Sequence, residues 1–343
     1  MEPIIEQLQG GKAGAPVIGI SGSRPNSKSV QAMTARVREA KAVPLLLANH
    51  AARSAARDIN KFDAVIILGN NFDADPHDYI GRYPEGDSRR RIHPETKSVL
   101  STPDSAARAA YEKALIALAL DAKMPLFCIC GGMHQLNIGC GGTLHQHIPD
   151  LLGHDRYSKN DGRNPASPVV PVTIVPGTAL ARIAAAQSLY APSFPPLIAN
   201  AGTVNSFHHQ AVDIVGKDLI VCASSEKYTA PDGEEARLIE AIEGDAGGRY
   251  RNQFLLGVQW HPEFLPDAPT TARIIHNVST AAGKFAHANQ RHHAPEEVQH
   301  ENILSALPML KEMSVASASR PFTDPLTPTT TPKGRTTSPG KSR

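Results

Sequence analysis

A cysteine, Cys130, stands where the apolar run Met124–Ile129 gives way to two glycines and a helical pattern. A nucleophile at such a strand-to-helix corner is lifted out of the sheet, and the strained turn requires small neighbours. The partial positive charge of the helix N-terminus favours a thiolate, and the backbone N–H groups that follow point to where an oxyanion would form. A cysteine before two glycines is equally compatible with core packing, so this pattern leaves both interpretations open.

The other cysteines give no sign of a metal site or a disulfide scaffold. We interpret Cys128 as a packing residue of the strand. Cys128 and Cys130 could also be a metal pair, but no second pair follows at zinc-finger spacing, so we expect no metal. Four cysteines in 343 residues are too few for a disulfide framework.

A base for a thiol nucleophile stands at the end of another apolar strand, Phe254–Gln259, which leads to His261 and Glu263. Residues two apart in an extended chain project to the same side, and Pro262 restricts the backbone between them. Glu263 can therefore orient His261 and stabilise its charge. The alternative is a histidine–glutamate pair on the surface at a strand end.

Apolar runs and helical patterns alternate along the first 130 residues, which predicts a parallel sheet with crossover helices. The predicted strands are Val17–Ile20, Val43–Ala48, Phe62–Gly69, Met124–Ile129, Val169–Val175, Leu219–Ala223, Leu238–Ile242 and Phe254–Gln259. The predicted helices are Val30–Ala42, Ala51–Ile59, a helix capped by Ser105 that ends near Asp121, and Thr270–Ala286.

Polar segments separate and follow these elements. The proline-interrupted stretch Gly81–Thr102 predicts a long loop, either a solvated insertion or a lid over a pocket. Beyond residue 288 we expect an extension with a short helix near Ile303–Met313. From about residue 314 its composition predicts disorder, and it is either inert or a docking or secretion signal.

Composition limits the classes of partner and compartment. Residues 1–320 carry a net charge of −1 and residues 321–343 a net charge of +3, so the body has no broad field for phosphates and we expect no nucleic acid partner. No apolar run approaches the length of a membrane span, and the first residues lack a basic leader. We therefore expect a cytoplasmic protein that does not contact a membrane.

Four blocks of the chain together resemble the class I glutamine amidotransferase-like hydrolases, in the γ-glutamyl-γ-aminobutyrate hydrolase branch. They are Gly69–Pro76, Ile129–Gln146 with its cysteine and glycines, Val204–Gln210, and Gly257–Glu263. The resemblance covers about residues 15–288 and implies one doubly wound, mostly parallel α/β domain of the flavodoxin-like kind. Residues 1–14 are then a flexible lead-in, and residues 289–343 are a C-terminal extension.

The resemblance also implies roles for individual residues. Cys130, His261 and Glu263 would be the catalytic triad, and the backbone N–H groups of Asn70 and Gly131 would stabilise the oxyanion. The residues expected to bind the substrate are His134, Asn205, Ser206, Phe207 and His208. For the block 205–210, a packed turn without contact to substrate is the alternative.

The sequence departs from the family pattern beside the nucleophile. Gly131 stands where the family usually has Arg, and His134 where it usually has Gln. The first choice of function is a stand-alone hydrolase of a small γ-glutamyl substrate, without a cofactor, and a homodimer is compatible with it. A glutaminase subunit that supplies ammonia to a partner synthase, and a binding or effector protein with a decayed site, are the alternatives.

Overall fold

A computed structural model of the protein describes residues 14–47, 52–96, 102–157, 167, 170–185, 202–230, 233–265 and 269–293. All of them fall within the first of two units of the chain, Met1–Ala306. The expected helix near Ile303–Met313, the C-terminal tail and most of the lead-in lie outside the described residues.

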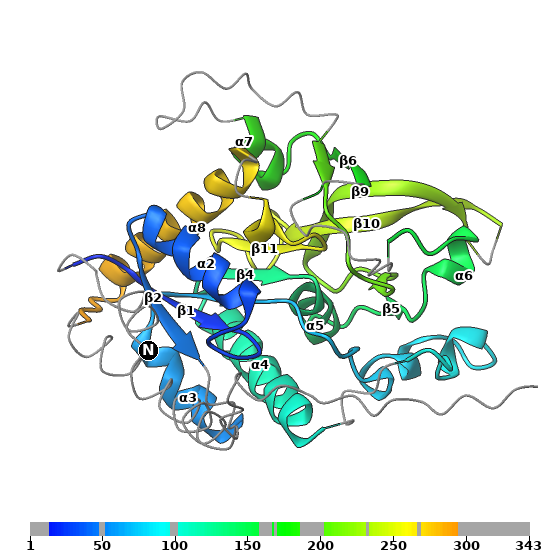
Figure 1. Ribbon diagram of the computed structural model, residues 1–343, viewed down its shortest axis with the longest axis horizontal. Coiled ribbons are helices and arrows are strands. Elements are labelled where there is room, and N and C mark those ends of the chain that lie inside the picture. Colours follow the sequence, from blue (N-terminus) through cyan, green and yellow to red (C-terminus); the bar gives the residue numbers. More distant parts are fainter. Residues whose placement is uncertain are drawn as a thin grey trace, which may run out of the picture. The chain divides into compact units, whose positions relative to one another are not determined.

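The strands are β1 (Val17–Ser21), β2 (Val43–Leu47), β3 (Ala64–Ile67), β4 (Leu126–Ile129), β5 (Leu144–His145), β6 (Val170–Ile174), β7 (Gly202–Val204), β8 (Ala211–Val212), β9 (Leu219–Thr229), β10 (Glu235–Gly244) and β11 (Leu255–Val258). They pair in the order β2-β1-β3-β4-β11-β10-β9-β6-β7 (Figure 1). The pairs from β2 to β11 are parallel, and those from β11 to β7 are antiparallel. β5 pairs with β8, which also pairs with β10.

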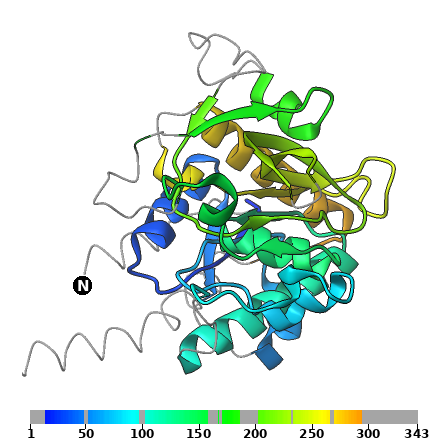
Figure 2. The same cartoon turned by 90° about the vertical axis from the view of Figure 1, so that its right-hand side faces the viewer.

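The α-helices are α2 (Lys28–Glu39), α3 (Ala55–Asp58), α4 (Pro103–Asp121), α5 (Gly131–Gly139), α6 (Pro149–Leu152), α7 (Ala179–Ala185) and α8 (Pro269–Ala288). The 3₁₀ helices are η1 (Ala52–Ser54), η2 (Ile59–Lys61), η3 (Pro76–Asp78), η4 (Ile80–Arg82), η5 (Ser88–Arg90) and η7 (Pro262–Phe264). Helices α2 and α8 pack together and on β1, whereas α4 packs on α3, α5 and β4. Figure 2 shows α8 in gold and α4 in teal on opposite sides of the strands. No helix among the described residues has the length and apolar character to cross a membrane.

The central strands are buried on both faces, which explains their continuous apolar runs. Alternate residues of a strand point to opposite faces. Ile66 and Phe127 pack in one hydrophobic cluster with α2 and α8, while Val65, Ile67 and Cys128 pack in a second cluster with α4 and α5. The expected parallel sheet covered by helices is therefore confirmed for the half of the sheet that ends at β11.

Several element boundaries differ from those expected. Helix α4 begins at Pro103, because the Thr102 side chain accepts the Ser105 N–H and so forms the cap that we expected from Ser105 itself. The expected helix 51–59 is divided into η1, α3 and η2. Strand β9 continues six residues past Ala223, since its outer half pairs with β10 beyond the apolar run.

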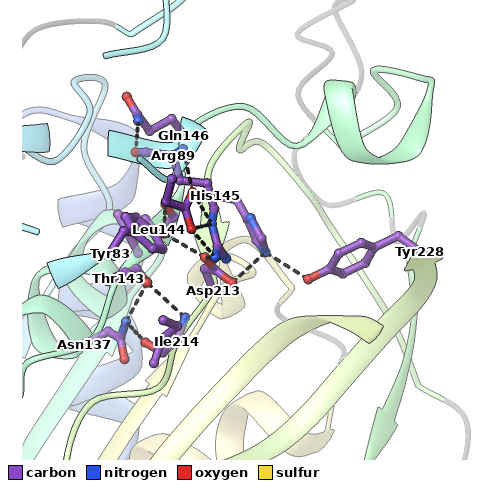
Figure 3. A network of polar contacts seen from close by, with 11 residues as sticks. Tyr83, Arg89, Asn137, Thr143, Leu144, His145, Gln146, Asp213, Ile214 and Tyr228 are labelled. Carbon is purple, nitrogen blue, oxygen red and sulfur yellow. Dashed lines mark hydrogen bonds and ion pairs between the residues drawn. The ribbon is translucent and has the colours of Figure 1, made fainter. Parts of the chain in front are cut away.

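The expected long loop 81–102 instead contains η5 and is held by polar contacts to β5 and β8 (Figure 3). Asp213 accepts hydrogen bonds from Tyr83 Oη at 2.7 Å and Arg89 Nη1 at 2.9 Å, and its second oxygen lies 3.3 Å from His145 Nε2. Gln146 Nε2 donates to the Arg91 carbonyl at 2.8 Å. The described part of this segment is mostly exposed, as expected for a solvated insertion, and the polar contacts hold it beside β5 and β8.

Candidate active site

Cys130 occupies the corner between β4 and α5. Its backbone has φ 52° and ψ −113°, a left-handed conformation that non-glycine residues rarely adopt, and its side chain is 6% exposed. Strain of this kind persists only where the surrounding structure enforces it, which is common at functional sites. The backbone N–H of Gly131 lies in the first turn of α5, where N–H groups have no acceptor within the helix.

His261 follows β11 and is joined to the buried carboxylate of Glu263. His261 Nδ1 donates to Glu263 Oε1 at 2.8 Å, and the same oxygen accepts a hydrogen bond from Ser29 Oγ at 2.5 Å. Ser29 belongs to α2, which packs on η7. A residue 234 positions earlier in the chain therefore fixes the carboxylate that orients the histidine.

The His261 ring and Cys130 converge on Gly69, at the end of the β3 segment. A Cβ at Gly69 would lie 2.6 Å from His261 Cε1 and 3.3 Å from Cys130 Cβ, so only glycine leaves room for both. Burial lowers the pKa of His261, but the charges of Glu263 and Cys130 and a hydrogen bond to Cys130 outweigh this effect and raise the pKa well above 6.5. This balance makes His261 a stronger proton acceptor than a free imidazole.

The segment 205–208 holds the histidine from the other side. Asn205 Nδ2 donates to the His261 carbonyl at 2.9 Å, and Asn205 Oδ1 accepts from the His261 N–H at 2.8 Å. The Phe207 ring meets the His261 ring edge-on, with centroids 6.1 Å apart. Ser206 Oγ donates to the Tyr157 carbonyl.

A cavity of about 260 Å³ opens beside Cys130. Its lining comes from loop residues 70–73, from Cys130, Gly131 and His134, from residues 207–210 and from His261. Among the residues expected to bind substrate, His134, Phe207 and His208 line this cavity, whereas Asn205 and Ser206 do not. Asn205 instead contacts the backbone of His261, and Ser206 packs against the neighbouring segment.

Two histidines that line the cavity, His134 and His208, form hydrogen bonds within the protein. His134 Nε2 bonds to Gln259 Oε1 at 2.8 Å, and burial lowers the pKa of His134 to about 4. His208 Nδ1 donates to the Gln210 carbonyl, and burial lowers the pKa of His208 to about 3. Both rings are therefore neutral at pH 7.

Sequence reasoning missed several groups at the site. Asp73, which lines the cavity, bonds through Oδ1 to His209 Nε2 at 2.9 Å, and Gln259 Nε2 donates to Cys130 Sγ at 3.7 Å. These residues stand inside the blocks that carry the family resemblance, so their position was a usable signal. No pattern in the sequence pointed to Ser29.

The cysteines other than Cys130 lie in the core. Burial raises the pKa of Cys128 and of Cys222 well above 9.0, so neither is a reactive thiolate at neutral pH. Within the described ranges, no group of three or more His, Cys, Asp or Glu side chains could hold a metal ion. The arrangement at Cys130 can perform nucleophilic catalysis, because a thiol, a base and an orienting carboxylate follow one another within hydrogen-bond reach.

One family model matches most of the chain, and several known proteins are similar to it. Residues 16–263 match Peptidase C26. The chain is 34% identical over 236 residues to the Mycobacterium tuberculosis protein named "Putative glutamine amidotransferase Rv2859c", covering 68% of this chain but only 61% of that protein. It is 27% identical over 232 residues to the γ-glutamyl-γ-aminobutyrate hydrolase PuuD of Escherichia coli K12, covering 63% of this chain and 69% of that one.

Among solved structures, the glutaminase domain of Trypanosoma brucei CTPS with bound acivicin aligns at a TM-score of 0.44 and 15% identity, covering 78% of this chain and 94% of that one. The family match extends from the strand β1 region to Glu263, the last residue of the Cys130–His261–Glu263 arrangement. The chain therefore belongs to the Peptidase C26 family, whose members are glutamine amidotransferase-like.

Proposed function

We propose that this protein is a hydrolase that cleaves the γ-glutamyl amide bond of small γ-glutamyl compounds through a thioester on Cys130. The observation that carries the proposal is the chain of contacts from Ser29 through Glu263 and His261 to Cys130 at the edge of the cavity. Membership of Peptidase C26 and similarity to a γ-glutamyl-γ-aminobutyrate hydrolase support this chemistry.

In the first half of the proposed reaction, the proton of Cys130 Sγ passes to His261 Nε2, and the thiolate attacks the γ-carbonyl carbon. The backbone N–H groups of Gly131 and Asn70 bind the oxyanion that forms. The C–N bond then breaks, and His261 gives its proton to the leaving amine. The γ-glutamyl group remains on Cys130 as a thioester.

In the second half, His261 takes a proton from a water molecule that attacks the thioester carbonyl. The tetrahedral intermediate collapses, the sulfur leaves, and glutamate is released. The hydrogen bond from His261 Nδ1 to Glu263 stabilises the imidazolium, while Asn205 keeps the ring in place through its two bonds to the His261 backbone.

The test is a substrate panel of γ-glutamyl-γ-aminobutyrate, γ-glutamyl peptides, folate polyglutamates and glutamine, with glutamate release as the readout. We expect hydrolysis of at least one γ-glutamyl amide by the wild type and none by Cys130→Ala. Cys128→Ala, which removes the neighbouring core thiol, is the matched control and should keep activity. Hydrolysis by Cys130→Ala would contradict the thioester mechanism.

A glutamine-like chloroketone separates this proposal from the alternatives. Labelling of Cys130 together with γ-glutamyl hydrolysis supports a stand-alone enzyme. Weak glutaminase activity that rises on addition of a synthase would instead identify an ammonia-supplying subunit, a possibility raised by the similarity to the mycobacterial protein. Failure of the wild type to react with either substrate or chloroketone would indicate a decayed site.

A further inference from the structure

A pair of buried polar side chains lies next to the sulfur of Cys130 and has no part in the proton transfers described above. Gln259 is 0% exposed and donates from Nε2 to Cys130 Sγ at 3.7 Å. Its other amide atom, Oε1, lies 2.8 Å from His134 Nε2. His134 in α5, Gln259 just after β11 and Cys130 are therefore connected by two successive hydrogen bonds.

We propose that Gln259 stabilises the Cys130 thiolate by hydrogen bonding and that His134 is the positioning residue that keeps the Gln259 amide in its donating orientation. This inference rests on the proposed function, because a thiolate is needed only if Cys130 is a nucleophile. On this proposal both residues favour ionisation of the Cys130 thiol. His134 then acts by orienting Gln259 and does not bind the substrate directly.

The two ends of the amide are chemically different, and each end matches its partner. A thiolate only accepts hydrogen bonds, so the amide NH₂ is the end that stabilises it. This orientation leaves the carbonyl oxygen for His134, whose Nε2 must then carry a proton. Reversal of the amide would place a carbonyl oxygen against the negative sulfur.

Burial keeps the Gln259 amide in this orientation and keeps the proton on His134 Nε2. His134 is 4% exposed and, with its pKa lowered to about 4, is a neutral ring with a single proton that Gln259 Oε1 accepts. The backbone of Gln259 is also fixed, because its N–H donates to the Glu240 carbonyl at 2.8 Å. An unpaired amide group in such a dry place is costly, which favours a single orientation.

The other titratable groups around the sulfur are His261, with Glu263 behind it, the neutral His208, and the Asp73–His209 pair, all in or next to the lining of the same cavity. Gln259 donates a hydrogen bond to the sulfur, and the charge of Cys130 acts on the pKa of His261. Both neighbours therefore favour the thiolate, so the loss of either should change how Cys130 ionises.

The experiment measures the rate of Cys130 alkylation by iodoacetamide against pH in the full chain, with peptide mapping to separate Cys130 from the core thiols. Gln259→Glu keeps the shape but places a negative acceptor at the sulfur. We expect the midpoint of the alkylation profile to rise by about one pH unit or more, with a roughly tenfold lower rate at pH 7.

Substitutions at position 134 test the positioning role. His134→Leu removes the donor to Gln259 Oε1 and should raise the midpoint by a smaller amount than Gln259→Glu. His134→Gln again offers an N–H to that oxygen, so it should return the midpoint most of the way to the wild-type value. Gln253→Glu is the matched amide-to-acid control, because Gln253 precedes β11 at the end remote from Cys130 and bonds to the Met124 carbonyl.

Two outcomes overturn the proposal. One is an unchanged alkylation midpoint in a folded Gln259→Glu variant. The other, which remains decisive if Gln259→Glu does not fold, is an identical midpoint in His134→Leu, His134→Gln and the wild type. Since alkylation needs no substrate, these results are separate from the γ-glutamyl assay, and a failure of this inference can be told from a failure of the proposed function.

Discussion

The side-chain amide of Asn70 lies against Gly131, in the space that any larger residue at position 131 would need. A Cβ built at Gly131 would lie 2.6 Å from both Asn70 Cγ and Asn70 Nδ2, closer than real Cβ contacts allow. We propose Asn70 and Gly131 as the oxyanion donors. The position of Asn70 therefore depends on residue 131 having no side chain.

This coupling predicts that Gly131→Ala displaces the Asn70 side chain and the loop that carries it, and lowers kcat/KM by about 100-fold, the lower end of the range known for loss of an oxyanion donor. Gly139→Ala is the matched control in the same helix, because its Cβ would meet nothing closer than 3.8 Å. In an Asn70→Gly background, Gly131→Ala should cost much less than in the wild type. Additive effects of the two substitutions would contradict the coupling.

The contacts of Glu263 predict a graded loss of activity around the triad. His261→Ala should abolish turnover, Glu263→Gln should lower kcat by about 10³- to 10⁴-fold, and Ser29→Ala by less than about tenfold. Burial lowers the pKa of His261 while the charge of Glu263 raises it, so Glu263→Gln should also move the basic limb of the pH–rate profile to lower pH. Near wild-type hydrolysis by His261→Ala would show that another residue is the base.

The buried ion pair of Arg108 and Glu112 predicts a loss of both stability and activity. Arg108 Nε bonds to Glu112 Oε1 at 2.8 Å, and Nη2 bonds to the carbonyls of Leu68 and Gly69, next to the oxyanion loop. Arg108→Met removes the charged partner of the buried Glu112 carboxylate and leaves it only the hydrogen bonds from Ser21 and Gln135. We therefore expect the free energy of unfolding in urea to fall by about 3 kcal/mol.

The control for Arg108→Met is Arg249→Met, which removes an exposed pair with Asp121 and should cost less than about 1 kcal/mol. Equal effects of the two substitutions would mean that burial of the Arg108 pair has no energetic consequence. The kcat/KM of folded Arg108→Met protein then shows whether the loop beside Gly69 has also moved, since a displaced loop should lower it.

Glu240 predicts a specific pH dependence of stability. Burial raises the pKa of Glu240 from 4.5 to about 7, opposed in part by a hydrogen bond from Ser225. Below pH 4.5 the carboxyl is protonated in both folded and unfolded chains, and as pH rises through about 7 the folded protein loses stability. Relative to Glu240→Gln, the wild type should lose about 3 kcal/mol between pH 4.5 and 8.

The measurement is urea unfolding of wild type and Glu240→Gln at matched pH values, because the difference between them cancels the contributions of the other titrating groups. Glu235→Gln, at the exposed start of the same strand, is the control and should differ from the wild type by a nearly constant amount. A difference for Glu240→Gln that does not change with pH would show that this carboxyl is not desolvated.

The sequence by itself predicted the parallel half of the sheet and the corner at Cys130. Both follow from local properties: continuous apolar runs for strands buried on two faces, and glycines where the chain must turn tightly. The four blocks of the family resemblance also gave the family correctly, which the match of residues 16–263 confirms. The antiparallel extension beyond β11 was less visible, because its outer residues are polar and gain their strand form from pairing.

Only the tertiary structure decided which side chains contact Cys130, His261 and Glu263. Ser29 contacts Glu263 from 234 residues away, His134 contacts Gln259 from 125 away, and Asn205 holds His261 from 56 away. Such contacts arise from the order of the strands and the packing of α2 and α5 upon them, and a single polar residue leaves no periodic trace in the sequence. Hydrophobic patterning specifies where the elements run, whereas the partner of each polar group is fixed only when distant elements pack together.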